Sequence, residues 1–210
     1  MTSPAVSAFD TAFARCSLVA ILRGVAPHEV EAIGDELVAA GFTLIEVPMN
    51  SPEPLDSVAR LAKRFAGRAI VGAGTVLKVE DVAAVADAGG TMIISPNANL
   101  DVIRASASAG LVSLPGIATP TEAFGALAAG ATALKLFPAE ASAPAVVKAM
   151  LAVLPAGTRI LPVGGIAPDT LDPWRTAGAA GFGLGSVLYK PAMSAREVGA
   201  RARAFVAALN

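Results

Sequence analysis

Residues 119–136, TPTEAFGALAAGATALKL, contain a complete helix-to-strand unit. Thr119 can cap the start of a helix, and Glu122 stands three residues later, as a capping box requires. Gly130 follows the last helical residue, where glycine enters the left-handed region without a Cβ penalty. The apolar run 131–136 after it is typical of a buried strand. These signals predict one repeat of an α/β fold.

The Ala-Gly pair that ends this helix recurs at 40–41, 88–89, 109–110 and 177–178, each time before a short apolar run. Helices that alternate with such runs favour a parallel sheet. The expected strands are 18–22, 42–47, 69–73, 92–95, 111–114, 131–136, 160–163 and 180–184.

About eight such units fill 210 residues without a break in composition, so the sequence predicts a single (β/α)8 TIM barrel domain over residues 1–210. We expect additional N-terminal and C-terminal helices, at 9–15 and 194–209, to close its ends. An open doubly wound sheet is the alternative, but no G-x-G-x-x-G follows the first strand.

Composition limits the partners. The chain has 16 Lys and Arg against 17 Asp and Glu, so its charge does not favour nucleic acid or an anionic membrane. One Cys and one His cannot supply a disulfide or a zinc cluster. The longest uncharged stretch, between Arg104 and Glu122, is interrupted by glycine and proline, and no leader-like apolar run begins the chain. We therefore expect a cytoplasmic protein without a metal or cofactor.

Polar residues end four of the predicted strands: Arg23, Glu46, Thr75 and Lys135. In a barrel, alternate strand residues point inward and the functional groups lie at the carboxyl ends of the strands. The alternation puts further residues on the same faces: Ala133 and Phe137 with Lys135, Leu44 with Glu46, and Val71 and Ala73 with Thr75. A buried ion pair, or strand ends that reach solvent, would also explain these charges. The convergence of two cations, an acid and a hydroxyl at one mouth favours a functional site.

Glycines form a second group. Gly164 and Gly165 follow the seventh strand, and Gly185 and Ser186 end the eighth. Barrels frequently bind phosphate at these two loops, where backbone N–H groups converge on the anion.

These residue types together describe one chemistry. A desolvated lysine has a lowered pKa, and its neutral amine can form a Schiff base with a carbonyl. A nearby carboxylate can move protons, an arginine can hold a substrate carboxylate, and the glycine loops can hold a phosphate. The expected enzyme is a metal-free aldolase for a phosphorylated keto acid.

Six stretches, in order, carry a family resemblance: AILRG (20–24), IEVPMNSP (45–52), GAGT (72–75), ALKLFP (133–138), VGG (163–165) and GLGS (183–186). The chain resembles the 2-keto-3-deoxy-6-phosphogluconate/galactonate aldolase family over nearly its whole length. The resemblance implies a class I aldolase of (β/α)8 type, usually a homotrimer.

The resemblance also implies a role for each matching residue. Lys135 would form the Schiff base, and Glu46, through a water, would be the general acid/base. Arg23 and Thr75 would hold the substrate carboxylate. The other binding residues would be Pro96 and Phe137 around the pyruvate, with Gly164, Gly165, Gly185 and Ser186 at the 6-phosphate.

Two differences within the family indicate the phosphogalactonate branch. Residues 48–51 are PMNS, where the gluconate type usually has Thr-Leu-Arg-Thr. Val163 stands where that type commonly has Thr, and the valine side chain offers no hydrogen bond to the C4 hydroxyl of the substrate. The expected substrate is 2-dehydro-3-deoxy-6-phosphogalactonate, cleaved to pyruvate and glyceraldehyde 3-phosphate in galactonate degradation. Two alternatives remain: cleavage of the gluconate epimer, and a non-catalytic barrel that binds phosphosugars.

Overall fold

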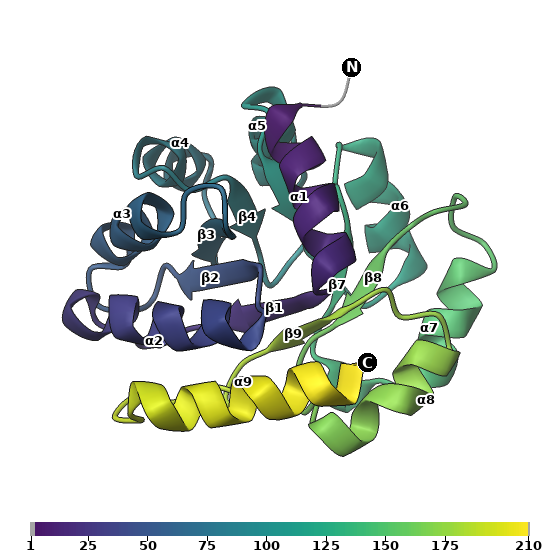
Figure 1. The fold of residues 1–210 in the computed structure, drawn as a ribbon. Helices are drawn as coiled ribbons and strands as arrows, with labels where there is room; N and C mark the ends of the chain where they lie inside the picture. The colour runs from purple at the N-terminus through teal and green to yellow at the C-terminus, as the bar shows by residue number, and fades with distance from the viewer. Residues whose placement is uncertain (1–2, 210) are drawn as a thin grey trace.

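The computed structural model describes residues 3–209, in which helices and short parallel strands alternate (Figure 1). The strands are β1 Leu18–Ile21, β2 Leu44–Pro48, β3 Ile70–Gly74, β4 Met92–Ile94, β5 Val112–Leu114, β6 Gly116–Ile117, β7 Leu134–Leu136, β8 Ile160–Pro162 and β9 Phe182–Leu184. The helices are α1 Pro4–Arg15, α2 Pro27–Ala40, α3 Pro54–Arg64, α4 Val79–Asp87, α5 Leu100–Ser108, α6 Pro120–Ala128, α7 Pro144–Leu151, α8 Leu171–Thr176 and α9 Ala195–Leu209, with 3-10 turns η1 Ala139–Ala141 and η2 Pro168–Thr170.

The sequence signals explain how these helices begin and end. Thr119 caps α6, and both halves of its capping box with Glu122 are present. Gly41 ends α2 at φ 106°, a conformation that glycine adopts without strain. The expected terminal helices are present as α1 and α9, although α1 begins at Pro4 rather than at residue 9.

The strands form two parallel sheets, in the orders β5-β4-β3-β2-β1-β9 and β6-β7-β8. The parallel α/β class is confirmed, but the expected single ring of eight strands is divided differently. The predicted fifth strand continues past Pro115 into β6, which pairs with β7 instead of β4. Pro115 has no N–H for the sheet ladder, which accounts for the division at this residue.

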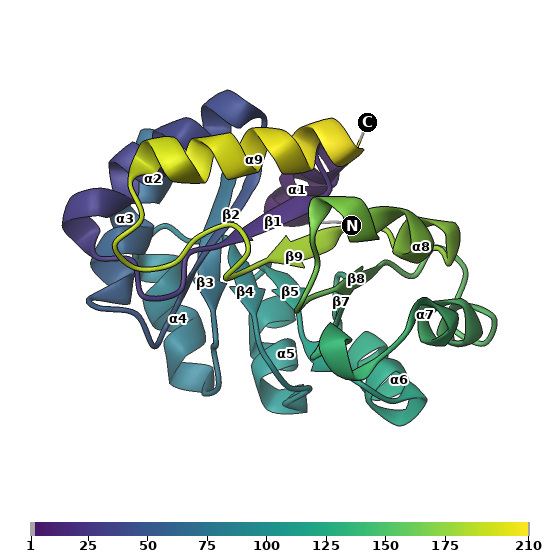
Figure 2. The same cartoon turned by 90° about the horizontal axis from the view of Figure 1, so that it is seen from below.

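Backbone contacts join the two sheets at both sides. Val163, just after β8, forms a bridge with Gly183 in β9. On the other side, the Thr132 N–H before β7 donates to the Ser113 carbonyl in β5 at 2.8 Å. Figure 2 shows the helices arranged around the strands.

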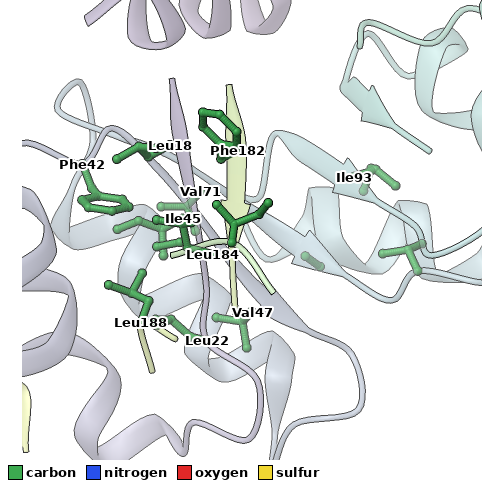
Figure 3. Packing of buried hydrophobic residues seen from close by; sticks show 14 of the residues in the cluster. Leu18, Leu22, Phe42, Ile45, Val47, Val71, Ile93, Phe182, Leu184 and Leu188 are labelled. Atoms are coloured by element: carbon green, nitrogen blue, oxygen red, sulfur yellow. The ribbon is translucent and has the colours of Figure 1, made fainter. Parts of the chain in front are cut away.

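Alternate strand residues pack into two separate apolar clusters. The larger cluster lies between strands and helices and includes Leu18, Ile45 and Phe182, which are labelled in Figure 3. The smaller cluster lies among the strands: Val19, Leu44, Met92, Ile94, Val112, Leu114, Ala133 and Leu161, with Phe9 and Ala12 of α1. Leu44 and Ala133 belong to this inner cluster. Glu46 and Lys135, two residues further along the same strands, therefore lie on the inward face of the sheet.

The expected face of β3 was wrong. Val71 and Ala73 belong to the larger cluster on the helix side, and Figure 3 draws Val71 there. The inward positions after Ile70 are the glycines 72 and 74, and a Cβ on Gly72 would lie 1.9 Å from the carbonyl oxygen of Met92. Glycine is therefore required where β3 passes close to its neighbours, and the larger Val71 packs outward.

Among residues 3–209, no helix combines the length and the apolar composition needed to cross a membrane.

Candidate active site

A cavity of about 510 Å³ opens at the carboxyl ends of the strands. It brings together residues that are far apart in the sequence, and ten of the eleven predicted site residues line it: Arg23, Thr75, Pro96, Lys135, Phe137, Val163, Gly164, Gly165, Gly185 and Ser186. The eleventh, Glu46, lies with Lys135 on a second cavity of about 10 Å³ among the strands. The predicted residues thus converge on one site.

Lys135 is the central cation of this site. It stands in the middle of β7 with 6% of its surface exposed, and its Nζ lies 4.8 Å from the centre of the Phe137 ring. Within residues 3–209 it forms no ion pair with a carboxylate. Burial lowers the pKa of Lys135, since desolvation disfavours the charged amine; Glu46 opposes this shift, and Arg23 adds to it. This lowered pKa favours the neutral, nucleophilic form of the amine.

Glu46 is the buried acid of this site. It is 1% exposed, and its Oε2 has no hydrogen-bond partner within the described residues. Burial raises the pKa of Glu46, against the opposing influence of Lys135 and Arg23. Gly74 makes room for the carboxylate, because a Cβ there would lie 1.3 Å from Oε2.

The acid and the amine line the same small cavity. Its volume of about 10 Å³ matches the room needed for one water, and Glu46 and Lys135 are the two charged residues among its apolar lining. A single water there could pass a proton between the carboxyl group and a molecule bound to Lys135.

Arg23 lies at the mouth of the cavity, at the end of β1. One of its guanidinium nitrogens donates to Asn50 Oδ1 at 2.8 Å and to Thr75 Oγ1 at 3.5 Å. Thr75 reaches this position because its backbone is left-handed, at φ 57°, which reverses the alternation of β3. Such a conformation is uncommon for a β-branched residue and is found at functional sites. The sequence pointed to Asn50 only as a family difference; its contact with Arg23 could not be seen there.

The two glycine loops, which follow β8 and β9, also line the cavity. Gly164 and Gly165 have φ of 116° and 63°, which only glycine adopts readily. Around Gly185 a Cβ would meet nothing within 4 Å, so space is open beside the exposed Ser186. Backbone groups in such open glycine turns can hold an anion.

Sequence reasoning missed three polar residues that also line the cavity: Glu140, Tyr189 and Lys190. The Tyr189 hydroxyl donates to Glu29 Oε1 at 2.9 Å, and burial raises the pKa of that hydroxyl. The available signal was their position, since Glu140 follows the lysine strand by four residues and Lys190 follows Ser186 by four.

The arrangement can bind a molecule with an anion at each end and a carbonyl between them. Arg23 offers a planar fork for a carboxylate, Lys135 offers an amine for the carbonyl, and the glycine loops suit a phosphate. In residues 3–209, no group of three or more His, Cys, Asp or Glu side chains is placed to hold a metal ion.

Comparisons with known proteins give similar results at several levels. The family described as KDPG and KHG aldolase matches residues 10–200. A probable 2-dehydro-3-deoxy-6-phosphogalactonate aldolase from Rhizobium meliloti (strain 1021) is 46% identical over 193 residues, which cover 92% of this chain and 91% of the relative. The 2-dehydro-3-deoxy-6-phosphogalactonate aldolase of Escherichia coli (strain K12) is 45% identical, with coverages of 91% and 93%.

A solved structure described as native KDPGal superposes with a TM-score of 0.90. It is 45% identical and is matched over 91% of this chain and 93% of the other.

Proposed function

The chain belongs to the KDPG and KHG aldolase family, and from this premise we propose that it cleaves 2-dehydro-3-deoxy-6-phosphogalactonate to pyruvate and glyceraldehyde 3-phosphate. The observation that carries the proposal is the buried Lys135, which faces a cavity of about 510 Å³ with a lowered pKa and no ion pair among the described residues. Catalysis would be that of a metal-independent class I aldolase.

The reaction would begin with attack of the Lys135 amine on C2 of the keto acid. Glu46, whose pKa is raised by burial, donates a proton to the departing hydroxyl, and water leaves. The product is an iminium beside a carboxylate. The new fixed positive charge stabilises the ionised form of Glu46, which prepares the acid to act next as a base.

Bond cleavage would follow from this charge arrangement. The Glu46 carboxylate removes the proton of the C4 hydroxyl, directly or through a water in the small cavity. The C3–C4 electron pair moves toward the iminium, so glyceraldehyde 3-phosphate leaves and an enamine remains on Lys135. Glu46 returns the proton to C3, and water hydrolyses the iminium to release pyruvate.

The binding roles are part of the same proposal. Arg23, held by Asn50, would bind the C1 carboxylate together with Thr75. Pro96 and Phe137 would wall the three-carbon part of the substrate. The backbones of Gly164, Gly165 and Gly185, with the Ser186 hydroxyl, would hold the 6-phosphate, and Val163 would lie near C4.

We also propose that the two sheets form one closed (β/α)8 barrel, as a single domain over residues 1–210. This is supported by the Val163–Gly183 bridge on one side and by the continuous chain from β5 to β6 on the other.

A homotrimer in the cytoplasm, serving galactonate degradation, follows from the family resemblance. Analytical ultracentrifugation tests the trimer, and a monomer would contradict it.

Trapping tests the catalytic assignment. Borohydride reduction with pyruvate should add the mass of the reduced adduct to Lys135, and an adduct on another lysine or none would refute the assignment. Turnover should be unaffected by a chelator, because the amine performs the activation.

Comparison of kcat/KM for the two C4 epimers tests the substrate: a preference for the gluconate epimer would favour that alternative. Ligand-induced thermal stabilisation without turnover would favour a non-catalytic binding barrel.

A further inference from the structure

Glu140 is a carboxylate that the mechanism above does not use. It lies in η1, directly after the strand that carries Lys135, and it is exposed to the large cavity. The neighbouring Ala139 N–H donates to the Val163 carbonyl at 2.9 Å, which fixes η1 against the end of β8. The position of Glu140 is therefore set by the fold.

The carboxylate rests on the glycine pair after β8. A Cβ on Gly164 would lie 1.9 Å from Glu140 Oε2, and one on Gly165 would lie 2.7 Å from its Cγ. The left-handed glycines thus leave space that the acid occupies, next to the loops expected to hold phosphate.

Glu140 has no hydrogen bond or ion pair among residues 3–209, and it is the one acid among the residues that line the large cavity. The other charged lining residues are Arg23, Lys135 and Lys190. A free carboxylate repels a phosphate that lies directly beside it, and a hydrogen-bond donor between the two groups offsets part of that repulsion. An uncharged hydroxyl on the substrate is such a donor, since an ionised carboxyl group only accepts hydrogen bonds.

We propose that Glu140 accepts a hydrogen bond from the hydroxyl that lies between the reacting carbon and the phosphate, which is C5 of the sugar acid and C2 of the aldehyde product. This rests on the proposed function and assigns Glu140 as a specificity-determining residue for hydroxylated aldehyde phosphates. Within the glycine loops, the phosphate would then lie nearer to Gly185 and Ser186 than to the acid.

The test uses the reverse reaction, condensation of pyruvate with an aldehyde. The two aldehydes are D-glyceraldehyde 3-phosphate and 3-phosphooxypropanal, which lacks only the C2 hydroxyl. The native enzyme should prefer the first in kcat/KM, and Glu140→Ala should reduce that preference about tenfold, the value of one charge-assisted hydrogen bond at an exposed site. Glu140→Gln keeps an acceptor oxygen and should recover part of the preference.

A control separates this effect from a change in net charge. Asp87→Ala removes an exposed acid at the end of α4, outside both cavities, and should leave the preference unchanged. If Glu140→Ala changes kcat/KM equally for both aldehydes, the carboxylate acts only through repulsion and the inference is overturned.

The condensation rate of the unaltered protein separates a failure of the proposed aldolase function from a failure of the role assigned to Glu140. If the unaltered protein does not condense pyruvate with glyceraldehyde 3-phosphate, the proposed function fails and the role of Glu140 fails with it. If the unaltered protein is active and the preference is the same in Glu140→Ala, only the role of Glu140 fails.

Discussion

At the scale of single residues, burial shifts the pKa values of Lys135 and Glu46 in opposite directions, and both shifts favour the uncharged form. Desolvation lowers the pKa of the amine and raises the pKa of the acid. A buried charge without a partner destabilises a fold, so this pair serves chemistry at the expense of stability.

Lys135→Met should abolish turnover and leave the protein at least as stable. Because the pKa of Lys135 is lowered on folding, the unfolded chain binds more protons below the ordinary value of 10.5, and native stability falls as pH falls. Met has no such titration, so the stability advantage of the variant should grow toward lower pH. Denaturant unfolding at several pH values measures this, and a variant less stable than the native protein at every pH would contradict it.

Glu46→Gln should slow cleavage but retain trapping of pyruvate on Lys135. The carboxyl group of Glu46 raises the pKa of Lys135 against the effect of burial, so its removal should shift the pH profile of trapping to lower pH. The readout is the rate of borohydride-trapped adduct across pH. A profile that moves to higher pH, or cleavage at the native rate, would remove Glu46 from its assigned role.

At the scale of elements, the start of α6 shows how a local signal contributes to the fold. Thr119 Oγ1 accepts from the Glu122 N–H at 3.3 Å, and the Glu122 carboxylate accepts from the backbone N–H groups of Ala118 and Thr119, both at 2.9 Å. Hydrogen bonds to the Glu122 carboxylate, first from the Ala118 N–H and then from the Thr119 hydroxyl and N–H, lower the pKa of Glu122. Their stabilisation is therefore present above the ordinary pKa of 4.5 and is lost as pH falls through the lowered value.

Thr119→Ala should lower stability by about 1 kcal/mol near neutral pH, which is roughly 2–4 °C in Tm for a chain of this size. The loss should be smaller in acid, where Glu122 becomes protonated. Thr121→Ala, two residues later in the same helix and exposed, is the matched control and should change Tm little. Equal losses from both variants would show that helix propensity, not the cap, matters here.

At the scale of the whole molecule, α1 closes the end of the strands opposite the candidate site. Phe9 is fully buried in the cluster that fills the space among the strands. Its neighbour Asp10 accepts from Arg159 at 2.6 Å, and the Arg159 guanidinium lies over the rings of Phe9 and Phe13 at 5.6 and 5.5 Å. The helix is thus part of the inner core.

Phe9→Ala should lower the free energy of unfolding by about 3–5 kcal/mol, because it removes a buried ring from the inner cluster. Val153→Ala, at a side chain that is 59% exposed, should cost less than about 0.5 kcal/mol. Denaturant unfolding measures both. A loss near that of Val153→Ala would mean that α1 does not contribute to this core.

The sequence alone determined the repeat of helix and strand and the strand ends that carry Arg23, Glu46 and Lys135. Caps, left-handed glycines and apolar runs are local signals, and the carboxyl ends of parallel strands must meet at one edge whatever their separation in the chain. The lining of one cavity by ten predicted residues depends on this rule.

Only the tertiary structure decided which face Thr75 uses, how the strands divide at Pro115, and that Asn50 and Glu140 join the site. Period-two reasoning assumes regular backbone, and the left-handed φ of Thr75 breaks that assumption. The contacts of Asn50 with Arg23 and of Glu140 with Gly164 join different loops, and their geometry is set by packing between elements rather than by local sequence.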